Sequence, residues 1–230
     1  MPNGFIKALA VTKFYEMGYS RLSALDRITT TINKGEFIAI LGPSGSGKST
    51  LMNLIGGLDL PEQGKIFVKG QDLSKLCDKE MSLYRNKTVG FVFQSFNLDN
   101  SLTAIENVML PLMYAGVSRS KRADIAYEAL SNVGLSDRVK HRPSELSGGQ
   151  RQRVSIARAI VNQPEIILAD EPTGNLDTQS GEMVLNLLQE LNKKGYTIIM
   201  VTHNPLQANY ANRVIEICDG KIVRDECLNN

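Results

Sequence analysis

Short apolar runs separated by glycine and by polar turns recur along the chain, and their spacing predicts strands that alternate with helices. Because these runs are apolar throughout, the strands they predict have both faces covered. A helical period of apolar residues lies between some of them, which indicates an α/β fold with a parallel sheet. The buried strands are expected at 37–41, 89–93, 166–169 and 197–201, and amphipathic helices at 151–160 and 183–191.

Two regions depart from this alternation. Residues 5–41 switch between apolar and polar positions in short runs, and Asp219-Gly220 separates two short apolar segments as a hairpin turn, so antiparallel strands are expected at the edge of the fold. Within about 95–162 the pattern turns helical, and it predicts an inserted helical subdomain. The whole chain, 1–230, is therefore expected to be a single domain.

Residues 42–49 have the form G-x-x-x-x-G-K-[ST], the pattern of a phosphate-binding loop. A predicted strand leads into it and a short apolar helix leads out, so backbone N–H groups and the helix dipole point at one anion site. Lys48 is expected to reach the β- and γ-phosphates, and the Ser49 hydroxyl to ligate Mg²⁺. The alternative is a glycine-rich turn that binds nothing, but a chance match is rare, about one in a hundred at average composition.

Polar residues close three of the predicted strands, at the carboxyl ends where α/β proteins bind ligands. Asp170 is suited to hold a Mg²⁺–nucleotide, and Glu171 to polarise water. Two adjacent acids repel each other, which favours function over structure there. Gln94 and His203 are weaker evidence for a ligand site, because a loop glutamine is usually solvated and a lone histidine is usually structural. The place of His203 at a strand end nevertheless favours a contact with the γ-phosphate.

Two further candidates leave alternatives open. Ser147, Gly148 and Gly149 precede the helix at 151–160, where they form either a second anion site or a plain helix cap with more glycine than a cap requires. Tyr15 lies well before the phosphate loop and is either a ring that stacks on a nucleotide base or an ordinary strand aromatic.

Composition narrows the class of protein. The chain is 42% hydrophobic and 22% charged, enough for a sizeable core, and its net charge of +2 gives no reason to expect nucleic acid as a partner. The three cysteines, an odd number without metal-ligand spacing, fit a reduced cytosolic protein. No signal-peptide pattern and no apolar run of about 20 residues is present, so we expect that the chain does not itself cross a bilayer.

With these motifs placed, the chain resembles the ATPase subunits of ATP-binding-cassette (ABC) transporters from about residue 6 to about residue 225. Residues 146–150, Leu-Ser-Gly-Gly-Gln, resemble the signature that separates this family from other phosphate-loop enzymes. The resemblance implies an ABC-type fold with ATP and Mg²⁺ as ligands. It implies catalytic roles for Lys48, Gln94, Glu171 and His203; metal contacts for Ser49, Gln94 and Asp170; and nucleotide contacts for Tyr15, Gly42, Pro43, Ser44, Gly45, Ser46, Gly47, Lys48, Ser49, Thr50, Ser147, Gly148, Gly149, Gln150 and Asp177.

The resemblance also implies a head-to-tail dimer in which the signature of one copy closes over ATP held by Lys48 of the other. Details such as Phe91-Val92-Phe93-Gln94 look like the macrolide-export and lipoprotein-release branch. We therefore expect an ATPase that drives a separate membrane permease from the inner face of the cell membrane, exporting a peptide, lipoprotein or antimicrobial-type substrate. The alternatives are a soluble cassette ATPase that serves a scaffold, as in iron–sulfur cluster assembly, and a module that binds nucleotide without hydrolysing it.

A docking surface for that permease is expected beside Gln94. Residues 96–102 follow this glutamine, and an apolar cluster, Met109–Tyr114, lies in the predicted helical region. Most of the cluster is expected to be core, with some members exposed for docking. The resemblance places a helix of the permease in this groove.

Overall fold

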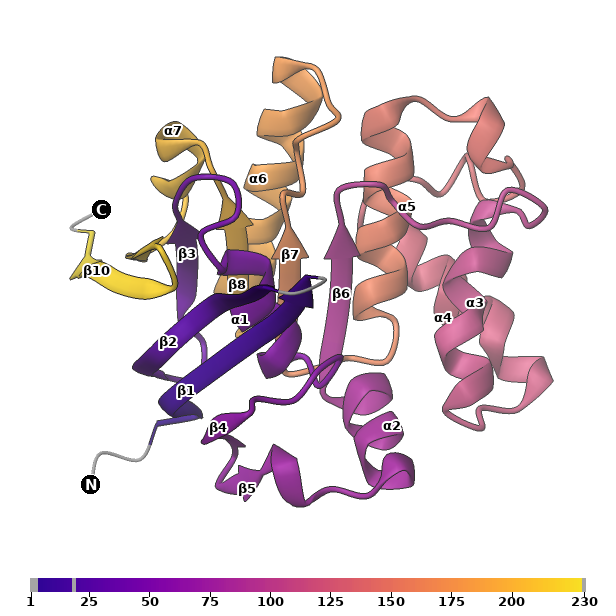
Figure 1. Ribbon diagram of the computed structural model, residues 1–230. Coiled ribbons are helices and arrows are strands. Elements are labelled where there is room, and N and C mark those ends of the chain that lie inside the picture. The colour runs from indigo at the N-terminus through magenta and orange to yellow at the C-terminus, as the bar shows by residue number, and fades with distance from the viewer. Residues whose placement is uncertain (1–3, 18–19, 229–230) are drawn as a thin grey trace.

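The computed structural model describes residues 4–17 and 20–228, and these contain two sheets and the helices that pack on them (Figure 1). The larger sheet has six strands in the order β10-β9-β3-β8-β7-β6, all parallel except β10, which pairs antiparallel to β9 at the edge. The predicted α/β class with an antiparallel edge is confirmed. Its strands are β3 (Phe37–Leu41), β6 (Val89–Phe93), β7 (Ile166–Asp170), β8 (Thr197–Thr202), β9 (Arg213–Cys218) and β10 (Lys221–Cys227).

The central strands send alternate side chains into two different cores, as the pleat of a strand requires. In β3, Ile38 and Ile40 belong to one buried cluster, whereas Phe37 and Ala39 belong to the other. The same alternation runs through β7 and β8. This is why these strands are apolar throughout in the sequence: each must fill a core on both faces.

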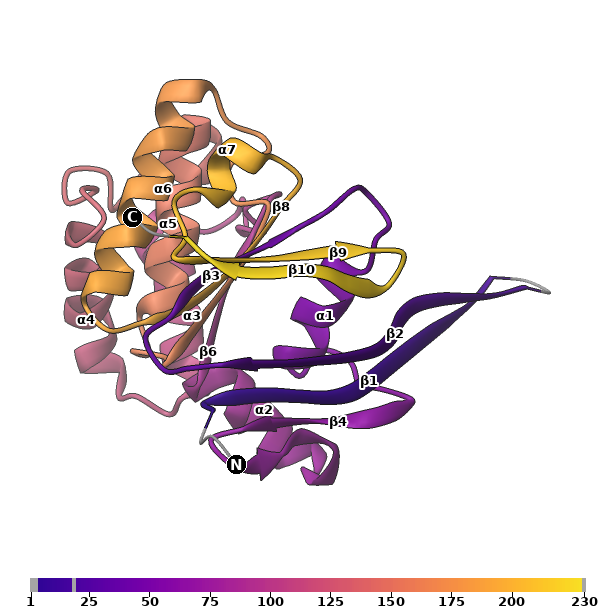
Figure 2. The same ribbon diagram turned by 90° about the vertical axis from the view of Figure 1, so that its left-hand side faces the viewer.

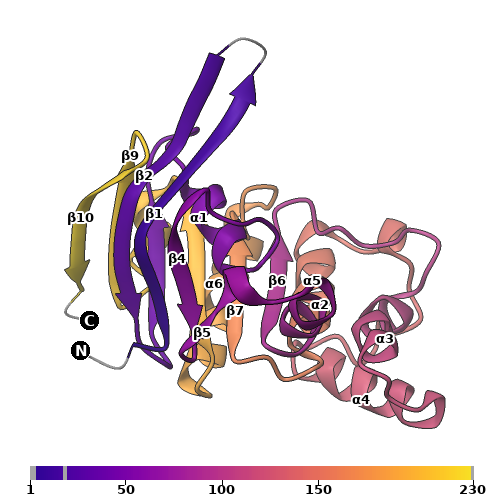
Figure 3. The same cartoon turned by 60° about the horizontal axis from the view of Figure 1, so that its bottom comes forward.

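One face of the six-stranded sheet is covered by helix α1 (Lys48–Ile55) and, beyond it, by a four-stranded antiparallel sheet (Figure 2). Leu51 and Leu54 of α1 are 1% exposed, and burying a side chain of this size contributes about 1.5–3 kcal/mol. The β1–β2 hairpin extends past the body of the molecule (Figure 3). The strands of this sheet are β1 (Ile6–Met17), β2 (Ser20–Ile32), β4 (Gln63–Val68) and β5 (Gln71–Asp72), in the order β2-β1-β4-β5.

Helices cover the other face and extend to the side of β6 (Figures 1 and 3). α6 (Thr178–Lys193) packs on the sheet, while α3 (Ala104–Tyr114) and α4 (Arg119–Ser131) gather around α5 (Gly148–Ile160) as a helical group. None of the helices within residues 4–17 and 20–228 is long and apolar enough to cross a bilayer. The short helix α7 (Pro205–Ala208) packs on β3 and β8, and its Ala208 belongs to the same core cluster as the buried residues of α6. Helix α2 (Asp78–Lys87) contacts β6, and single 3-10 turns span Leu73–Lys75 and Pro143–Glu145.

Local boundaries differ from the sequence pattern by a few residues, each for a physical reason. The first helix begins at Lys48, so the last two residues of the phosphate-loop pattern already belong to its first turn. Helix α5 begins at Gly148, directly after its cap Ser147. The Asp219-Gly220 turn has φ values of +47° and +74°, the pair of left-handed residues that a tight hairpin favours. Its second strand, β10, runs on to Cys227.

The packing of α5 on β6 generates a stability prediction. A Cβ added at Gly90 would collide with the carbonyl of Ala159, whereas one added at Gly181, inside α6, would make only ordinary contact with Thr173. Gly90→Ala is expected to lower the free energy of unfolding by about 1–3 kcal/mol through overpacking. Gly181→Ala, the matched control, should raise it by about 0.5–1 kcal/mol, because alanine loses less entropy in a helix. Urea unfolding measures both changes in the free energy of unfolding. Changes of the same sign in the two variants would contradict the close packing of Gly90 against Ala159.

Candidate active site

The phosphate loop connects the end of β3 to the first turn of α1, and the backbone conformation there requires glycine. Gly47 has φ +103° and precedes the helix, and a Cβ on it would collide with the carbonyl of Ala24. A Cβ on Gly42 would likewise collide with the carbonyl of Ile217. The loop is therefore held tightly between β3, β9 and β2, and the free N–H groups at the N-terminus of α1 give it the chemistry of an anion site.

Lys48 is the cation of this loop. It is 6% exposed, and its Nζ donates a hydrogen bond of 2.7 Å to the Pro43 carbonyl. Burial lowers the pKa of Lys48, and the nearby charges of Glu171 and Asp170 oppose that shift. The lysine is thus curled onto its own loop, next to two carboxylates, where an incoming phosphate would replace the carbonyl as its partner.

Asp170 ends β7 and faces the phosphate loop. The Ser49 hydroxyl donates to Asp170 Oδ1 over 3.1 Å. Burial raises the pKa of Asp170, and the charge of Glu171 raises it further, against the Ser49 hydrogen bond and the Lys48 charge. A hydroxyl beside a carboxylate is the hard oxygen set that Mg²⁺ prefers. No three His, Cys, Asp or Glu side chains gather into a metal site within the described part of the chain, so a divalent ion here would complete its shell from nucleotide and water.

Glu171 and His203 form a pair at the ends of β7 and β8. His203 Nδ1 lies 2.9 Å from Glu171 Oε1, at hydrogen-bond distance. Glu171 has φ +43°, an unusual backbone conformation that costs on the order of 1–3 kcal/mol for a residue other than glycine. Its N–H donates to the Val201 carbonyl, which fixes this turn to β8. This backbone conformation places the Glu171 carboxylate at the same edge of the sheet as Lys48.

Gln94 follows β6 and contacts the loop after Glu171 rather than the phosphate loop. A Cβ on Gly174 would lie 2.6 Å from Gln94 Nε2, so the glutamine side chain rests on this glycine. Asn175 Nδ2 donates to the Gln94 carbonyl over 3.0 Å. In the described residues no hydrogen bond joins Gln94 to Ser49 or Asp170, so its expected metal contact stays a prediction.

The Ser-Gly-Gly-Gln stretch begins α5 as a capping box. Ser147 Oγ accepts from the Gln150 N–H, and Gln150 Oε1 accepts from the Ser147 N–H. A Cβ on Gly149 would lie 2.8 Å from Ser180 Oγ, and one on Gly148 would lie 3.2 Å from Leu176. Close packing against Ser180 and Leu176 therefore explains why two glycines follow the capping serine, although a cap alone does not require them. Their role towards a nucleotide stays a prediction, because no hydrogen bond in the described residues joins this stretch to the phosphate loop of the same chain.

Two other predicted site residues have clear structural roles. Tyr15 lies on β1, where its hydroxyl donates to Asp59 Oδ2 over 3.2 Å and the Lys13 ammonium lies 5.4 Å from its ring centroid. Lys13 is itself paired with Asp59 at 2.7 Å, which anchors this part of the hairpin. Asp177 caps α6 by accepting from the Ser180 N–H. Neither contact tests the expected contacts with ATP.

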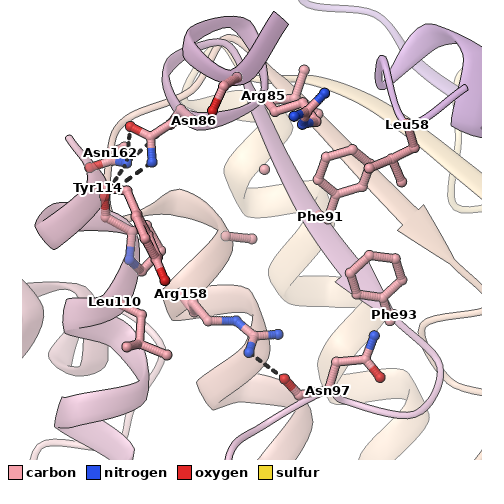
Figure 4. Close-up of a pocket in the computed structure, with 15 residues that line it drawn as sticks. Leu58, Arg85, Asn86, Phe91, Phe93, Asn97, Leu110, Tyr114, Arg158 and Asn162 are labelled. Carbon is pink, nitrogen blue, oxygen red and sulfur yellow. Dashed lines mark hydrogen bonds between the residues drawn. The ribbon is translucent and has the colours of Figure 1, made fainter. Parts of the chain in front are cut away.

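A groove opens between β6, α2, α3 and α5 (Figure 4). Its volume is about 560 Å³. The rings of Phe91 and Phe93 stack along one wall with centroids 5.6 Å apart, and Tyr114, 82% exposed, stands on the opposite side. Leu98, in the segment expected at the docking surface, is half-buried and packs on one side against the core. The groove is lined by Leu58, Ser82, Arg85, Asn86, Val89, Gly90, Phe91, Phe93, Asn97, Leu110, Pro111, Tyr114, Arg158, Ala159 and Asn162.

Comparisons with known proteins agree with this geometry. A family model described as ABC transporter matches residues 25–174. An uncharacterized ABC transporter ATP-binding protein of Bacillus subtilis, YvrO, is 52% identical over 216 residues, 94% of each chain. The macrolide export ATP-binding/permease protein MacB of Hyphomonas neptunium is 52% identical over 215 residues, which are 94% of this chain and 33% of that protein. A solved dimeric post-hydrolysis cassette bound to ADP and Pi aligns with a TM-score of 0.89 and 44% identity, covering 98% of this chain and 99% of that one.

The raised pKa of Asp170 generates a pH prediction. A carboxyl whose pKa rises on folding favours its neutral form, so the charged form destabilises the nucleotide-free protein above that pKa. Asp170→Asn keeps an oxygen for Ser49 and should raise the melting temperature at pH 8. The gain should shrink as the pH falls through the raised pKa towards 3.8, where Asp170 itself becomes neutral.

Asp177→Asn is the matched control for this experiment. Hydrogen bonds from Ser180 lower the pKa of Asp177, so its charged form stabilises the fold, and this substitution should lower the melting temperature at pH 8. Thermal scans of both variants between pH 4 and pH 8 check the opposite signs. A loss of stability in Asp170→Asn at pH 8 would contradict the assignment of burial as the dominant effect.

Proposed function

Because this chain belongs to the ABC transporter family, we propose that it is the subunit that binds and hydrolyses ATP for a separate membrane permease, through ATP-driven head-to-tail dimerisation. The chain is an ABC ATPase, as the family match and the relative solved with ADP and Pi establish. The observation that carries the residue assignment is that Lys48, Ser49, Asp170, Glu171 and His203 meet at the carboxyl ends of β3, β7 and β8.

Each of these residues has a role that follows from its chemistry. Lys48 leaves the Pro43 carbonyl for the β- and γ-phosphates, while the N–H groups of residues 45–50 hold the phosphate oxygens. Ser49 and Asp170 would hold Mg²⁺, which neutralises charge on the phosphates when bound. Glu171 then accepts the proton of the attacking water, and His203, oriented by Glu171, contacts the γ-phosphate.

Dimerisation is proposed because the two candidate anion sites of one chain, the phosphate loop and the start of α5, are not joined by a hydrogen bond in the described residues. Ser147 caps α5, and Gly149 at the start of this helix packs on Ser180 of α6. Each site would then serve a different nucleotide in a head-to-tail pair, with the signature of one copy on the ATP of the other. The dimeric state of the solved relative supports this arrangement. Tyr15 would stack on adenine from the hairpin side, and Asp177 would lie near the dimer contact.

A permease partner is proposed because the homologous segment of MacB is part of a protein named for both ATP binding and permease. The groove between the stacked rings and Tyr114 would receive a helix of that permease, at the inner face of the cell membrane. Export of a peptide, lipoprotein or antimicrobial-type substrate would follow from the macrolide-export name of the relatives. The soluble-scaffold alternative is not favoured, since the relatives are named as transporter ATP-binding proteins.

Glu171→Gln tests the hydrolysis mechanism. The amide cannot accept the proton of water, so ATP turnover should fall by about 10²–10⁴-fold. ATP binding should persist, because Lys48 and the phosphate loop are unchanged. With ATP trapped, the variant should form a dimer in light scattering, and with ADP it should remain monomeric, because both helix N-termini need the γ-phosphate. Lys48→Ala is the contrasting variant and should weaken ATP binding itself.

Two results would refute these assignments. Wild-type turnover in Glu171→Gln would exclude this carboxylate as the base. Equal molecular mass with ATP and with ADP would argue against dimer closure on the γ-phosphate.

Tyr114→Glu tests the docking groove. Tyr114 is 82% exposed, so a charge there should leave basal ATPase activity and melting temperature within error of wild type. It should reduce co-purification of the membrane permease from detergent-solubilised membranes and abolish stimulation of ATPase activity by that fraction, because a buried unpaired charge opposes docking. Tyr127→Glu, on the adjacent helix α4 and 48% exposed, is the matched control and should change neither. Full stimulation of Tyr114→Glu would place the partner elsewhere.

A further inference from the structure

Gln152 is a fully buried polar residue that none of the assignments above uses. It lies in the first half of α5, and its side chain is 0% exposed. Its Nε2 donates to the Pro172 carbonyl over 2.7 Å and to the Phe93 carbonyl over 3.3 Å. Its Oε1 has no hydrogen-bond partner among the described residues. The amide therefore acts in this site as a donor to two backbone carbonyls.

The two accepting carbonyls stand next to the residues proposed to act on ATP. Phe93 ends β6 and directly precedes Gln94, and Pro172 directly follows Glu171. One side chain of the signature helix thus fastens the strand end that carries the glutamine and the turn that carries the base. The turn is tied to the glutamine a second time, since Asn175 donates to the Gln94 carbonyl.

The same helix holds the segment that follows Gln94. Arg158 donates to the carbonyls of Phe96 and Asn97, and the Arg151 guanidinium lies 5.1 Å from the Phe96 ring centroid. Phe96 and Asn97 have φ values of +61° and +50°, so this segment keeps an unfavourable backbone that outside contacts must hold. Arg158 also lines the groove described above (Figure 4). Helix α5 therefore contacts residues 93–97 along its length, from Gln152 near the signature to Arg158 at the groove.

We propose that Gln152 is a positioning residue that fixes the signature helix to the turns of Gln94 and Glu171, so that a movement of the helical group moves both. The proposal rests on the roles assigned to Gln94 and Glu171 under the proposed function. An apolar side chain would fill the same space, but only a double donor bridges two carbonyls, one at the end of β6 and one in the turn after β7. Because the bridge touches neither the phosphate loop nor the signature cap, its loss should change turnover without changing the binding of ATP to the monomer.

Gln152→Met tests this with nearly unchanged volume and no donor. Misplacement of the two turns should lower kcat about tenfold to a hundredfold while KM stays within about twofold. In a Glu171→Gln background, the ATP-induced dimer should also require a higher protein concentration. Ser155→Ala is the matched control: Ser155 is one turn further along α5, equally buried, and its hydroxyl has no hydrogen-bond partner among the described residues. It should leave kcat, KM and dimerisation unchanged.

Gln152→Glu adds a second readout, the pH dependence of kcat, which a change in packing alone would not alter. A charged carboxylate faces two carbonyls without a donor, whereas the protonated acid regains one O–H donor. The kcat of this variant, relative to wild type at each pH, should therefore rise as the pH is lowered from 8 to 6. All rates are measured well below the melting temperature of each variant.

The outcomes separate the possible failures. Wild-type kcat and dimerisation in Gln152→Met at a reduced melting temperature would overturn the proposal and leave the residue as a structural bridge. An equal loss of kcat in Ser155→Ala would also overturn it, because the effect would then belong to general packing of α5. Turnover retained in Glu171→Gln alone would instead refute the proposed function, whatever the behaviour of Gln152→Met.

Discussion

The parallel register of β3, β8 and β7 is the constraint on which the site depends. Leu41 pairs with Thr202, and Val201 pairs with Asp170, so the three strands end at one edge of the sheet. Glu171 and His203 follow two of these ends directly, and Lys48 follows the third end after the phosphate loop, although the three residues are far apart in sequence. A shift of one residue in any strand would turn its side chains to the other face and empty one of the two cores. The apolar strands thus determine the geometry of the charged site.

The site contains two ionisable groups, Lys48 and Asp170, whose charged forms are disfavoured by burial in the fold. Burial lowers the pKa of Lys48 and raises the pKa of Asp170. Among the described residues, the hydrogen bonds to their charged ends come from the Pro43 carbonyl and the Ser49 hydroxyl. The backbone of Glu171 is also strained. A phosphate chain with a divalent ion would provide partners for Lys48 and Asp170 together, which is the physical reason we propose for binding of a magnesium nucleotide at this site.

Communication within the chain runs along α5. Its N-terminus carries the signature residues, its first turns hold Phe93 and Pro172 through Gln152, and Arg158 holds the segment at the groove. A rigid helix that contacts these three proposed functional regions would transmit a movement at one of them to the other two. This is the kind of connection that a transport ATPase requires between its partner and its nucleotide.

The sequence by itself determined what depends on local order along the chain. Some features are each formed by a few consecutive residues, so the spacing of those residues predicts their geometry. These are the phosphate loop, the acids at the end of β7, the capped start of α5 and the Asp219-Gly220 turn. The class of the fold followed from strands that are apolar on both faces. The tertiary structure alone decided contacts between segments far apart: Tyr15 with Asp59, Gln94 with Gly174 and Gln152 with two carbonyls. No periodicity marks such pairs, because their partners meet only after the strands have paired and the helices have packed on them.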